Sequence, residues 1–338
     1  MKIILKIFIV LIIFAEIIFP QQKLAQTGFK FLNVGLGARA TGMAEAFTSV
    51  EQNSLGMFYN PSSMARQNNF IDVSIGSTSW IADISHNNFS ASISPNSGEW
   101  GVFGFAMQSV DYGLIEGTIL ANNYKGYLDE SDLPGLNLKP TAMSFGFGYA
   151  KALSDKFQIG GNIKYVLQNL GESIVEKNAD ETYLKHNNKL NMAAYDFGLI
   201  YKTGYKSLNI GMSIRNFAKE VKFEKENFQI PLIFRIGASV NAIDFIEDVD
   251  KEMHSLLVSV DASHPRDFPE QVNIGTEYQF MNMISLRFGN MIYNKEFGST
   301  FGIGVRKKIM DYELGVDYSS TDNEDFGSIN RISIQFNF

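Results

Sequence analysis

The chain has 338 residues and a formal net charge of −7, which argues against a nucleic-acid partner because no basic cluster offsets the acidic balance. It contains no cysteine, which excludes disulfides, thiolate metal sites, a cysteine nucleophile and a lipid anchor on cysteine. Apolar residues make up 45% of the chain and charged residues only 19%, a low charged share for a soluble protein.

The N-terminal segment, residues 1–25, has the layout of an export signal. Two lysines precede an apolar run from Ile7 to Ala15, and polar residues follow it. The run is short for a membrane-spanning helix, and no later segment has about 18 consecutive apolar residues. We therefore expect an exported chain, cleaved after Ala15 or after Ala25. Such a chain is either a soluble periplasmic β protein or an outer-membrane barrel.

Residues 26–69 show no strand-like alternation. Gly35, Gly37 and Gly42 lie among small residues that allow close backbone packing, and Asn60-Pro61 marks a turn before the strands begin. The segment also carries four phenylalanines and a tyrosine, which need cover from water. The pattern predicts a hatch or plug inside or beneath a barrel. The alternative is a surface loop with a short helix near residues 43–47.

From residue 70 onward the chain repeats segments in which polar and apolar side chains alternate, as they do on the two faces of a strand. Fourteen such segments are present, at 70–79, 84–94, 100–111, 141–150, 156–169, 192–202, 206–216, 231–242, 254–264, 270–280, 283–291, 297–307, 310–319 and 327–338. Each is about ten residues long, which is the length of a tilted strand that crosses a bilayer. The chain is also rich in glycine (29) and phenylalanine (28) and poor in proline (8), which suits many long paired strands. Residues 70–338 are therefore predicted to form an all-β, antiparallel transmembrane β-barrel of about 14 strands.

The connections between these segments alternate in length. Three of them, 112–140, 170–191 and 217–230, are long and polar, whereas those on the opposite side are mostly tight turns. Outer-membrane barrels sort short turns and long loops in this way, and a soluble β-sandwich has no reason to do so. The acidic connection 243–253 is the exception, because it is long yet falls on the side of the short turns. An even strand number places both termini on that side, the periplasm.

The alternation also predicts which side chains face lipid. Phe147 and Ile303 belong to the apolar set, and their neighbours Gly146 and Gly302 belong to the inner set. The inner face carries charges of both signs: Arg235, Asp261, Glu277, Arg287, Arg306, Asp317 and Arg331. Opposite charges on neighbouring strands can pair, so each of the last three arginines should lie near a carboxylate from an adjacent strand or from the hatch. A self-neutralised lumen with glycines between the charges suits a plugged barrel, although barrel interiors are polar in general.

The segment from Phe31 to Ala65 resembles the start of the PorV/PorQ family. The likeness lies in the run Gly-Ala-Arg-Ala-x-Gly-Met, which includes Arg39, in the following Ala-Phe, and in Asn-Pro. Glu45 stands where a glycine is common in that family, and Pro61 is followed by Ser-Ser rather than Ala-Gly. The resemblance implies a FadL-like outer-membrane barrel of fourteen strands with an N-terminal hatch, associated with type IX secretion. PorV-type members bind the C-terminal signal domains of exported cargo.

Nothing in the sequence favours an enzyme or a cofactor. The histidines lack a nucleophile in a suitable position, and phosphate-loop, zinc and calcium patterns are absent. The action is therefore predicted to be binding or conduction. The connection 112–140 is rich in apolar and aromatic groups, among them Tyr112, Leu114, Tyr124 and Tyr127, which suits a surface for a protein partner. It could instead fold inward over the barrel mouth.

Three functions remain open from the sequence, the last of which is a purely structural barrel or a surface adhesin. The first is an outer-membrane accessory of a type IX-like secretion system that binds exported cargo or translocon partners. The second is a FadL-like transporter with a hydrophobic ligand in its lumen.

Overall fold

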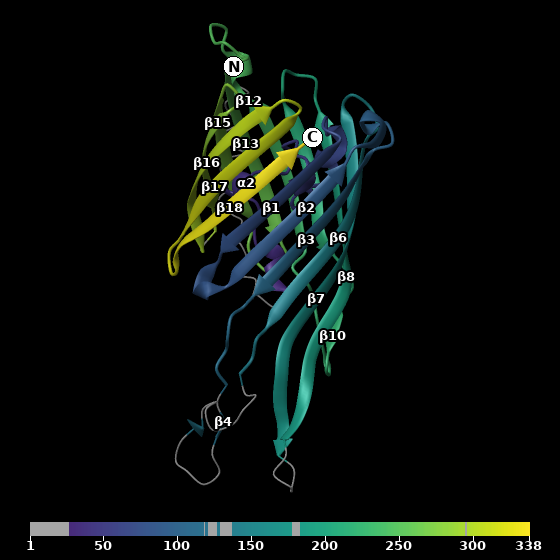
Figure 1. Ribbon diagram of the computed structural model, residues 1–338, viewed down its shortest axis with the longest axis vertical. Coiled ribbons are helices and arrows are strands. Elements are labelled where there is room, and N and C mark those ends of the chain that lie inside the picture. The colour runs from purple at the N-terminus through teal and green to yellow at the C-terminus, as the bar shows by residue number, and fades with distance from the viewer. Residues whose placement is uncertain (1–26, 118, 121–126, 129–136, 178–182, 295) are drawn as a thin grey trace, which may run out of the picture.

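The computed structural model describes residues 27–117, 119–120, 127–128, 137–177, 183–294 and 296–338. Within this part the chain forms a closed antiparallel barrel of fourteen strands (Figure 1). The predicted export signal, residues 1–25, lies outside the described residues. In the described part, no helix is both long and apolar enough to cross a membrane.

The barrel strands follow the chain order and each pairs with the next, which confirms the predicted architecture. They are β1 (Ile71–Ser79), β2 (Ser85–Ile93), β3 (Val102–Asp111), β6 (Thr141–Ala152), β7 (Phe157–Lys177), β8 (Tyr183–Lys202), β9 (Asn209–Phe217), β12 (Ile233–Asn241), β13 (His254–Pro265), β14 (Gln271–Phe280), β15 (Ile284–Ile292), β16 (Phe297–Ile309), β17 (Tyr312–Asn323) and β18 (Gly327–Asn337). Two small hairpins lie outside the wall: β4 (Ile119–Leu120) with β5 (Tyr127–Leu128), and β10 (Val221–Phe223) with β11 (Glu226–Phe228).

The barrel closes where its first strand meets its last. In the β1–β18 ladder Ile75 lies opposite Ile334, and Gly76 lies opposite Ser333. Closure leaves no open sheet edge, which is required of a sheet that crosses a lipid bilayer. The alternation of side chains follows the prediction: Phe147 is 68% exposed on the outside, whereas Gly146 is buried.

The two ends of the barrel differ. At one end, which we call the turn end, the strands are joined by short turns such as residues 153–156, and β1 begins and β18 ends there. The connection 242–253, which contains η6 (Ala242–Phe245), is the long exception at this end. At the other end, the loop end, lie the described parts of the connection 112–140 and residues 218–232.

The expected loop at 170–191 is largely strand, which corrects the prediction. β7 and β8 stay paired past Asn169 through two shifts of register, the first of which places Glu172 opposite Asn187, and form a two-stranded ribbon that extends beyond the barrel (Figure 1). The ribbon exposes both of its faces, since Glu172, Ser173 and residues 184–187 are all exposed. It therefore needs no apolar face, and the alternation test could not detect it.

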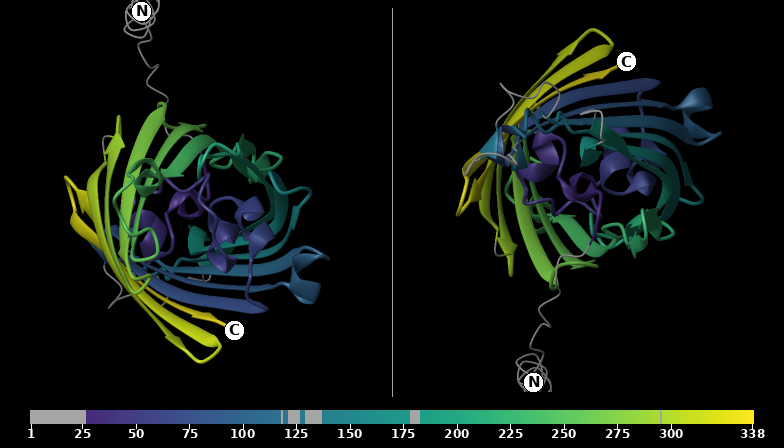
Figure 2. Two further views of the ribbon diagram at one scale, coloured as in Figure 1. Left: turned by 90° about the horizontal axis from the view of Figure 1, so that it is seen from above. Right: turned by 90° about the horizontal axis from the view of Figure 1, so that it is seen from below.

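The segment before β1 lies inside the ring of strands in both end-on views (Figure 2). Its short helices are η1 (Lys30–Asn33), α2 (Ala38–Thr41), η2 (Ser54–Phe58) and η3 (Pro61–Arg66). Two others, η4 (Ile81–Asp83) and η5 (Pro95–Gly98), lie in wall connections. We refer to residues 27–69 as the hatch. Its apolar side chains Phe29, Phe31, Phe47 and Tyr59 are buried.

Candidate functional site

The barrel wall has glycine at several points where the hatch passes so close that no side chain would fit. A Cβ atom on Gly160 would lie 2.4 Å from the Ser62 backbone nitrogen, and one on Gly198 would lie 1.8 Å from Oδ1 of Asn60. Real Cβ atoms essentially never come within 3.0 Å of such atoms. The same close approach recurs around the wall at Gly211, Gly275 and Gly289. The hatch is therefore seated against the wall backbone to backbone.

Asn60-Pro61 attaches the hatch to the wall beside these glycines. The Asn60 side-chain amide donates to the backbone carbonyls of Thr48 (2.7 Å) and Leu199 (3.2 Å), so it joins two hatch segments to β8. Its carbonyl accepts the backbone N–H of Ser62 at 3.1 Å and so caps η3. Pro61 starts that helix, where a missing N–H costs nothing.

The three hatch glycines predicted from the sequence have different surroundings. Gly37 has φ 83°, a left-handed conformation that favours glycine. Gly42 packs against the wall, where its Cβ would lie 3.1 Å from the Cα of Gly302. Gly35 faces the carboxylate of Glu45 so closely that a Cβ would collide with it.

A chain of charged groups ties the hatch to β14, β15 and β17. Arg39 donates to the two oxygens of Glu277 at 2.9 and 2.7 Å, and Glu277 also accepts from Arg287 at 2.5 Å. Arg287 in turn contacts Asp317 at 2.7 Å, and Arg306 lies 3.7 Å from the same carboxylate. Because Glu277, Arg287 and Asp317 are buried, each of these charges needs its partners, and loss of one leaves another uncompensated.

A second cluster surrounds Glu45. Nη2 of Arg235 lies 2.9 Å from Oε2 of Glu45. One oxygen of Asp261 accepts the backbone N–H groups of Phe47 and Thr48, each at 2.9 Å. The wall thus supplies both a cation and an anion to the turn at residues 44–48, which fixes that turn by hydrogen bonds at both of its ends.

Arg331 departs from the expected pattern. Its Nε donates to the backbone carbonyl of Gly35 at 3.0 Å and its Nη1 to Thr321 at 2.9 Å. Among the described residues, no carboxylate lies within ion-pair distance of it. The reason lies in the register: the cross-strand neighbours of Arg331 are Thr78 on β1 and Ser319 on β17, and neither carries a charge.

Tyr59 joins the hatch to itself. Its hydroxyl donates to the backbone carbonyl of Leu36 at 2.7 Å. Burial, with a further contribution from Glu45, raises the pKa of Tyr59 above its ordinary value, so the phenol remains neutral and keeps its donor proton.

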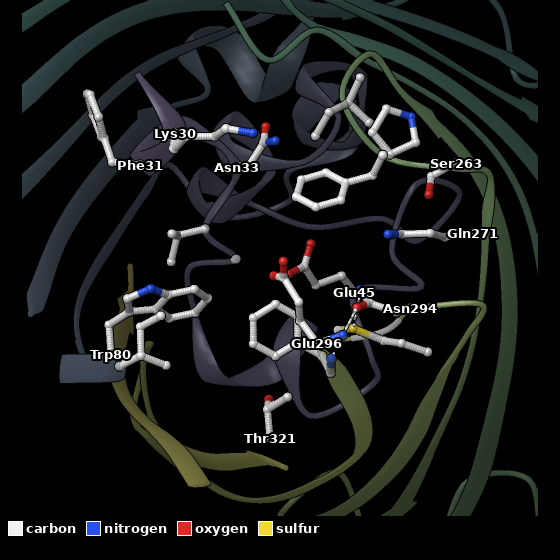
Figure 3. A pocket seen from close by; sticks show the side chains of 18 of the residues that line it. Lys30, Phe31, Asn33, Glu45, Trp80, Ser263, Gln271, Asn294, Glu296 and Thr321 are labelled. Atoms are coloured by element: carbon white, nitrogen blue, oxygen red, sulfur yellow. Dashed lines mark hydrogen bonds between the residues drawn. The ribbon is translucent and has the colours of Figure 1, made fainter. Parts of the chain in front are cut away.

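A cavity of about 460 Å³ lies inside the barrel on the loop-end side of the hatch (Figure 3). Hatch residues form part of its lining, and Trp80, which precedes η4, contributes an aromatic wall. The Trp80 ring lies 5.5 Å from that of Phe297 and 5.8 Å from that of His86. The other lining residues are Lys30, Phe31, Asn33, Val34, Gly35, Glu45, Ile81, Ile84, Tyr112, Ile233, Arg235, Ser263, Pro265, Phe268, Gln271, Asn273, Met291, Asn294, Glu296, Thr321 and Arg331.

The residues expected to form a partner loop separate in the structure. Tyr112 lines the cavity, whereas Leu114 is 52% exposed at the loop end. The backbone of Tyr127 pairs with Leu120 in the β4–β5 hairpin, and Tyr124 lies outside the described residues. Part of this connection therefore turns inward and part faces solvent.

Sequence reasoning did not identify Trp80 or His86 as cavity residues. Trp80 is one of only two tryptophans in the chain, which is a signal in itself, but nothing local places it against the lumen. Within the described ranges, no group of three or more acidic or histidine side chains is arranged to hold a metal ion.

The model of a family described as "Type IX secretion system membrane protein PorP/SprF" matches residues 131–337. Among solved structures, the toluene transporters TbuX of Ralstonia pickettii and TodX of Pseudomonas putida each align with a TM-score of 0.57 and 12% identity, covering 89% of this chain and 97% of theirs. A FadL homologue of Pseudomonas aeruginosa aligns with a TM-score of 0.53 and 10% identity, covering 93% of this chain and 99% of that one. At these identities the likeness shows a shared fold. A search of curated protein sequences finds no match.

Proposed function

Because the chain belongs to the family of PorP/SprF type IX secretion system membrane proteins, we propose that it acts as a protein-binding accessory barrel of that system. The protein lies in the outer membrane of a Gram-negative-type bacterium, where lipid surrounds the barrel wall. The proposed partners are exported cargo or translocon subunits, which it binds through the loop end on the cell surface.

The observation that carries this proposal is the seating of the hatch. The wall glycines and the Arg39–Glu277 pair bind the hatch to strands around the barrel. Moving it out of the lumen would strip buried charges of their partners, which is costly. Such an interior suits a barrel that works through its surface better than one that opens for each passing solute.

The loop end offers apolar surface for a partner. Leu114 and Ile115 are 52% and 48% exposed, and Ile115 is fixed by two backbone hydrogen bonds to Leu138, each of 2.9 Å. Fixed, exposed apolar groups cost little entropy when a partner covers them. We therefore propose these two residues as part of the contact surface for exported cargo.

The experiment replaces Leu114 and Ile115 together by serine and measures surface delivery of a type IX cargo in cells. We expect delivery to fall strongly while the barrel stays folded and heat-modifiable in the outer membrane. The matched control is Leu153→Ser, an exposed leucine at the turn end (57%), which should leave delivery unchanged. Normal delivery by the double variant would refute a contact role for this surface.

The resemblance of residues 31–65 to PorV/PorQ barrels lies outside the matched range 131–337. We retain it as a proposal about the hatch alone: a hatch of PorV/PorQ kind inside a PorP/SprF barrel.

Uptake of a hydrophobic solute is the second candidate. The cavity and the fold shared with toluene transporters favour it. Loss of hydrophobic-solute uptake in a strain that lacks the barrel, with normal cargo delivery, would support this function in place of the first.

A further inference from the structure

The connection 242–253 at the turn end is longer than its neighbours and has a fixed shape. It joins β12 to β13 and projects beyond the strands, beginning with η6 (Figure 1). The side-chain carbonyl of Asn241 accepts the backbone N–H of Ile243 at 3.3 Å, which caps η6, and it also accepts a backbone N–H of β13 at 2.9 Å. Further along, Oδ1 of Asp250 accepts the backbone N–H of Glu252 at 2.9 Å. Hydrogen bonds therefore order both ends of the connection.

The neighbouring connection 203–208, between β8 and β9, supports this one from the side. Nζ of Lys206 donates to the backbone carbonyl of Asp244 at 2.6 Å and lies 4.2 Å from the centre of the Phe245 ring. The rings of Tyr205 and Phe245 lie 6.0 Å apart. Because the two connections hold each other in place, their exposed side chains lose little conformational entropy when a partner covers them.

The two connections expose apolar side chains beside a hollow in the surface. Tyr205 is 61% exposed, Phe245 is 48% exposed and Ile246 is 46% exposed. Aromatic groups of this kind supply the central contacts of protein interfaces. The hollow is lined by Lys206, Asp244, Phe245, Ile246, Glu247 and Lys251.

The connection 242–253 is also strongly acidic. It carries five carboxylates and one lysine, a net charge of −4 in a chain whose formal net charge is −7. Among the described residues, no lysine or arginine lies within ion-pair distance of these carboxylates. Their charge is therefore available to a partner. The five are Asp244, Glu247, Asp248, Asp250 and Glu252.

This combination of groups distinguishes a protein partner from a lipid surface. Segments that bind lipid head groups place lysine and arginine beside their aromatic residues, because the head groups include anionic lipids. Here carboxylates lie beside Phe245 and Ile246, and anionic head groups would repel them. An acidic surface with an apolar centre is instead complementary to a basic protein surface.

We propose that Tyr205, Phe245 and Ile246, with the acidic residues of 247–252, form a docking surface for a periplasmic protein whose contact face is basic. An apolar side chain of that protein covers Phe245 and Ile246, and its lysines or arginines pair with the surrounding carboxylates. The proposal rests on a turn end that faces the periplasm. It does not depend on cargo binding at the loop end, so the two are tested independently.

The first experiment locates the partner in cells. The photo-crosslinking amino acid p-benzoylphenylalanine replaces Ile246, and the crosslinked species is identified by mass spectrometry. We expect one discrete periplasmic protein. The matched control places the same crosslinker at Leu153, which is 57% exposed in another turn at this end, and should not yield that protein.

The second experiment tests the charge, using the identified protein after purification and the full barrel in lipid nanodiscs. Replacing Glu247 and Asp248 together by lysine should weaken binding about tenfold or more, and so should Phe245→Ser. The control replaces Glu324 and Asp325 by lysine, which makes the same change of charge on an exposed turn at the loop end, and should leave binding unchanged. Heat-modifiability verifies that each variant is folded.

Four results would overturn the proposal. Crosslinking of position 246 to lipid alone would show a membrane anchor, and no crosslinked species at all would show an unoccupied surface. A crosslinked protein on the cell surface would show that this end faces outward. Equal binding by the unaltered barrel and the Glu247→Lys, Asp248→Lys barrel would refute the role of charge. The crosslinking leaves the acidic residues intact, so the proposal remains refutable if the lysine variant fails to fold.

Discussion

Gly160 and Gly161 on β7 offer a direct test of how the hatch is seated. The two glycines are adjacent and receive the same substitution, but they face opposite sides of the wall. A Cβ on Gly160 would lie 2.4 to 2.7 Å from three backbone atoms of Pro61 and Ser62, whereas the nearest atom to a Cβ on Gly161 is 3.7 Å away. Neither glycine has a positive φ, so alanine is tolerated by the backbone at both.

The magnitudes follow from these distances. Ordinary contact begins near 3.4 Å, so Gly160→Ala must displace hatch backbone by about an ångström, and overpacking of this kind costs about 1–3 kcal/mol. Gly161→Ala meets no obstacle and restricts the unfolded chain, which stabilises a protein by about 0.4–1 kcal/mol. The two variants should therefore differ by roughly 1.5–4 kcal/mol in the free energy of unfolding.

The assay is urea unfolding of each variant in lipid vesicles, followed by tryptophan fluorescence, with heat-modifiability as the check of folding. Equal stability of the two variants would show that the hatch does not press on β7 at this point. A Gly161→Ala barrel less stable than Gly160→Ala would show that the inside and outside of the strand are reversed.

Three further results are expected. Phe147→Arg should destabilise the barrel by about 2–4 kcal/mol near the bilayer midplane, whereas Gly146→Ser should be mild; both are measured by urea unfolding in vesicles. Arg39→Gln should lower the free energy of unfolding by about 1.5–3 kcal/mol, because it leaves the buried Glu277 without its partner. Arg39→Lys keeps the charge and should lose less, so an equal loss in both variants would argue against a charge pair. The pKa of Tyr59 is raised in the folded state, so above about pH 10 the unfolded chain loses the phenol proton while the folded protein keeps it. The free energy of unfolding should therefore fall as the pH rises above about 10. Tyr59→Phe should reduce that fall, and an unchanged pH slope would contradict the assignment.

The wall was predictable from the sequence because one physical rule governs it. Lipid outside and a polar interior require side chains to alternate every second residue. The expected strand containing Phe147 ends at residue 150 and β6 ends at Ala152, whereas both begin at Thr141. The ribbon beyond Asn169 was missed because both of its faces are exposed, so no alternation is imposed.

The interior was predictable only in outline. The inner position of the charges follows from alternation, and so does the Glu277–Arg287 pair, since these residues are direct cross-strand neighbours. The hydrogen bond from Arg331 to the backbone carbonyl of Gly35 could not be read in this way, because Gly35 belongs to the hatch. Hatch contacts join residues hundreds of positions apart, and no local pattern encodes them.

The hatch contacts also govern the order in which the molecule can be built. The backbone N–H of Ala38 donates to Ser333 at 2.8 Å across 295 positions, and Asp72 on β1 accepts from Gln335 at 2.7 Å across 263 positions. The hatch therefore cannot complete its contacts until β18 is in place. Contacts of such separation form slowly, because a long loop must close before they contribute. We therefore expect the sheet to curl around its own N-terminal segment, with the β1–β18 ladder forming last.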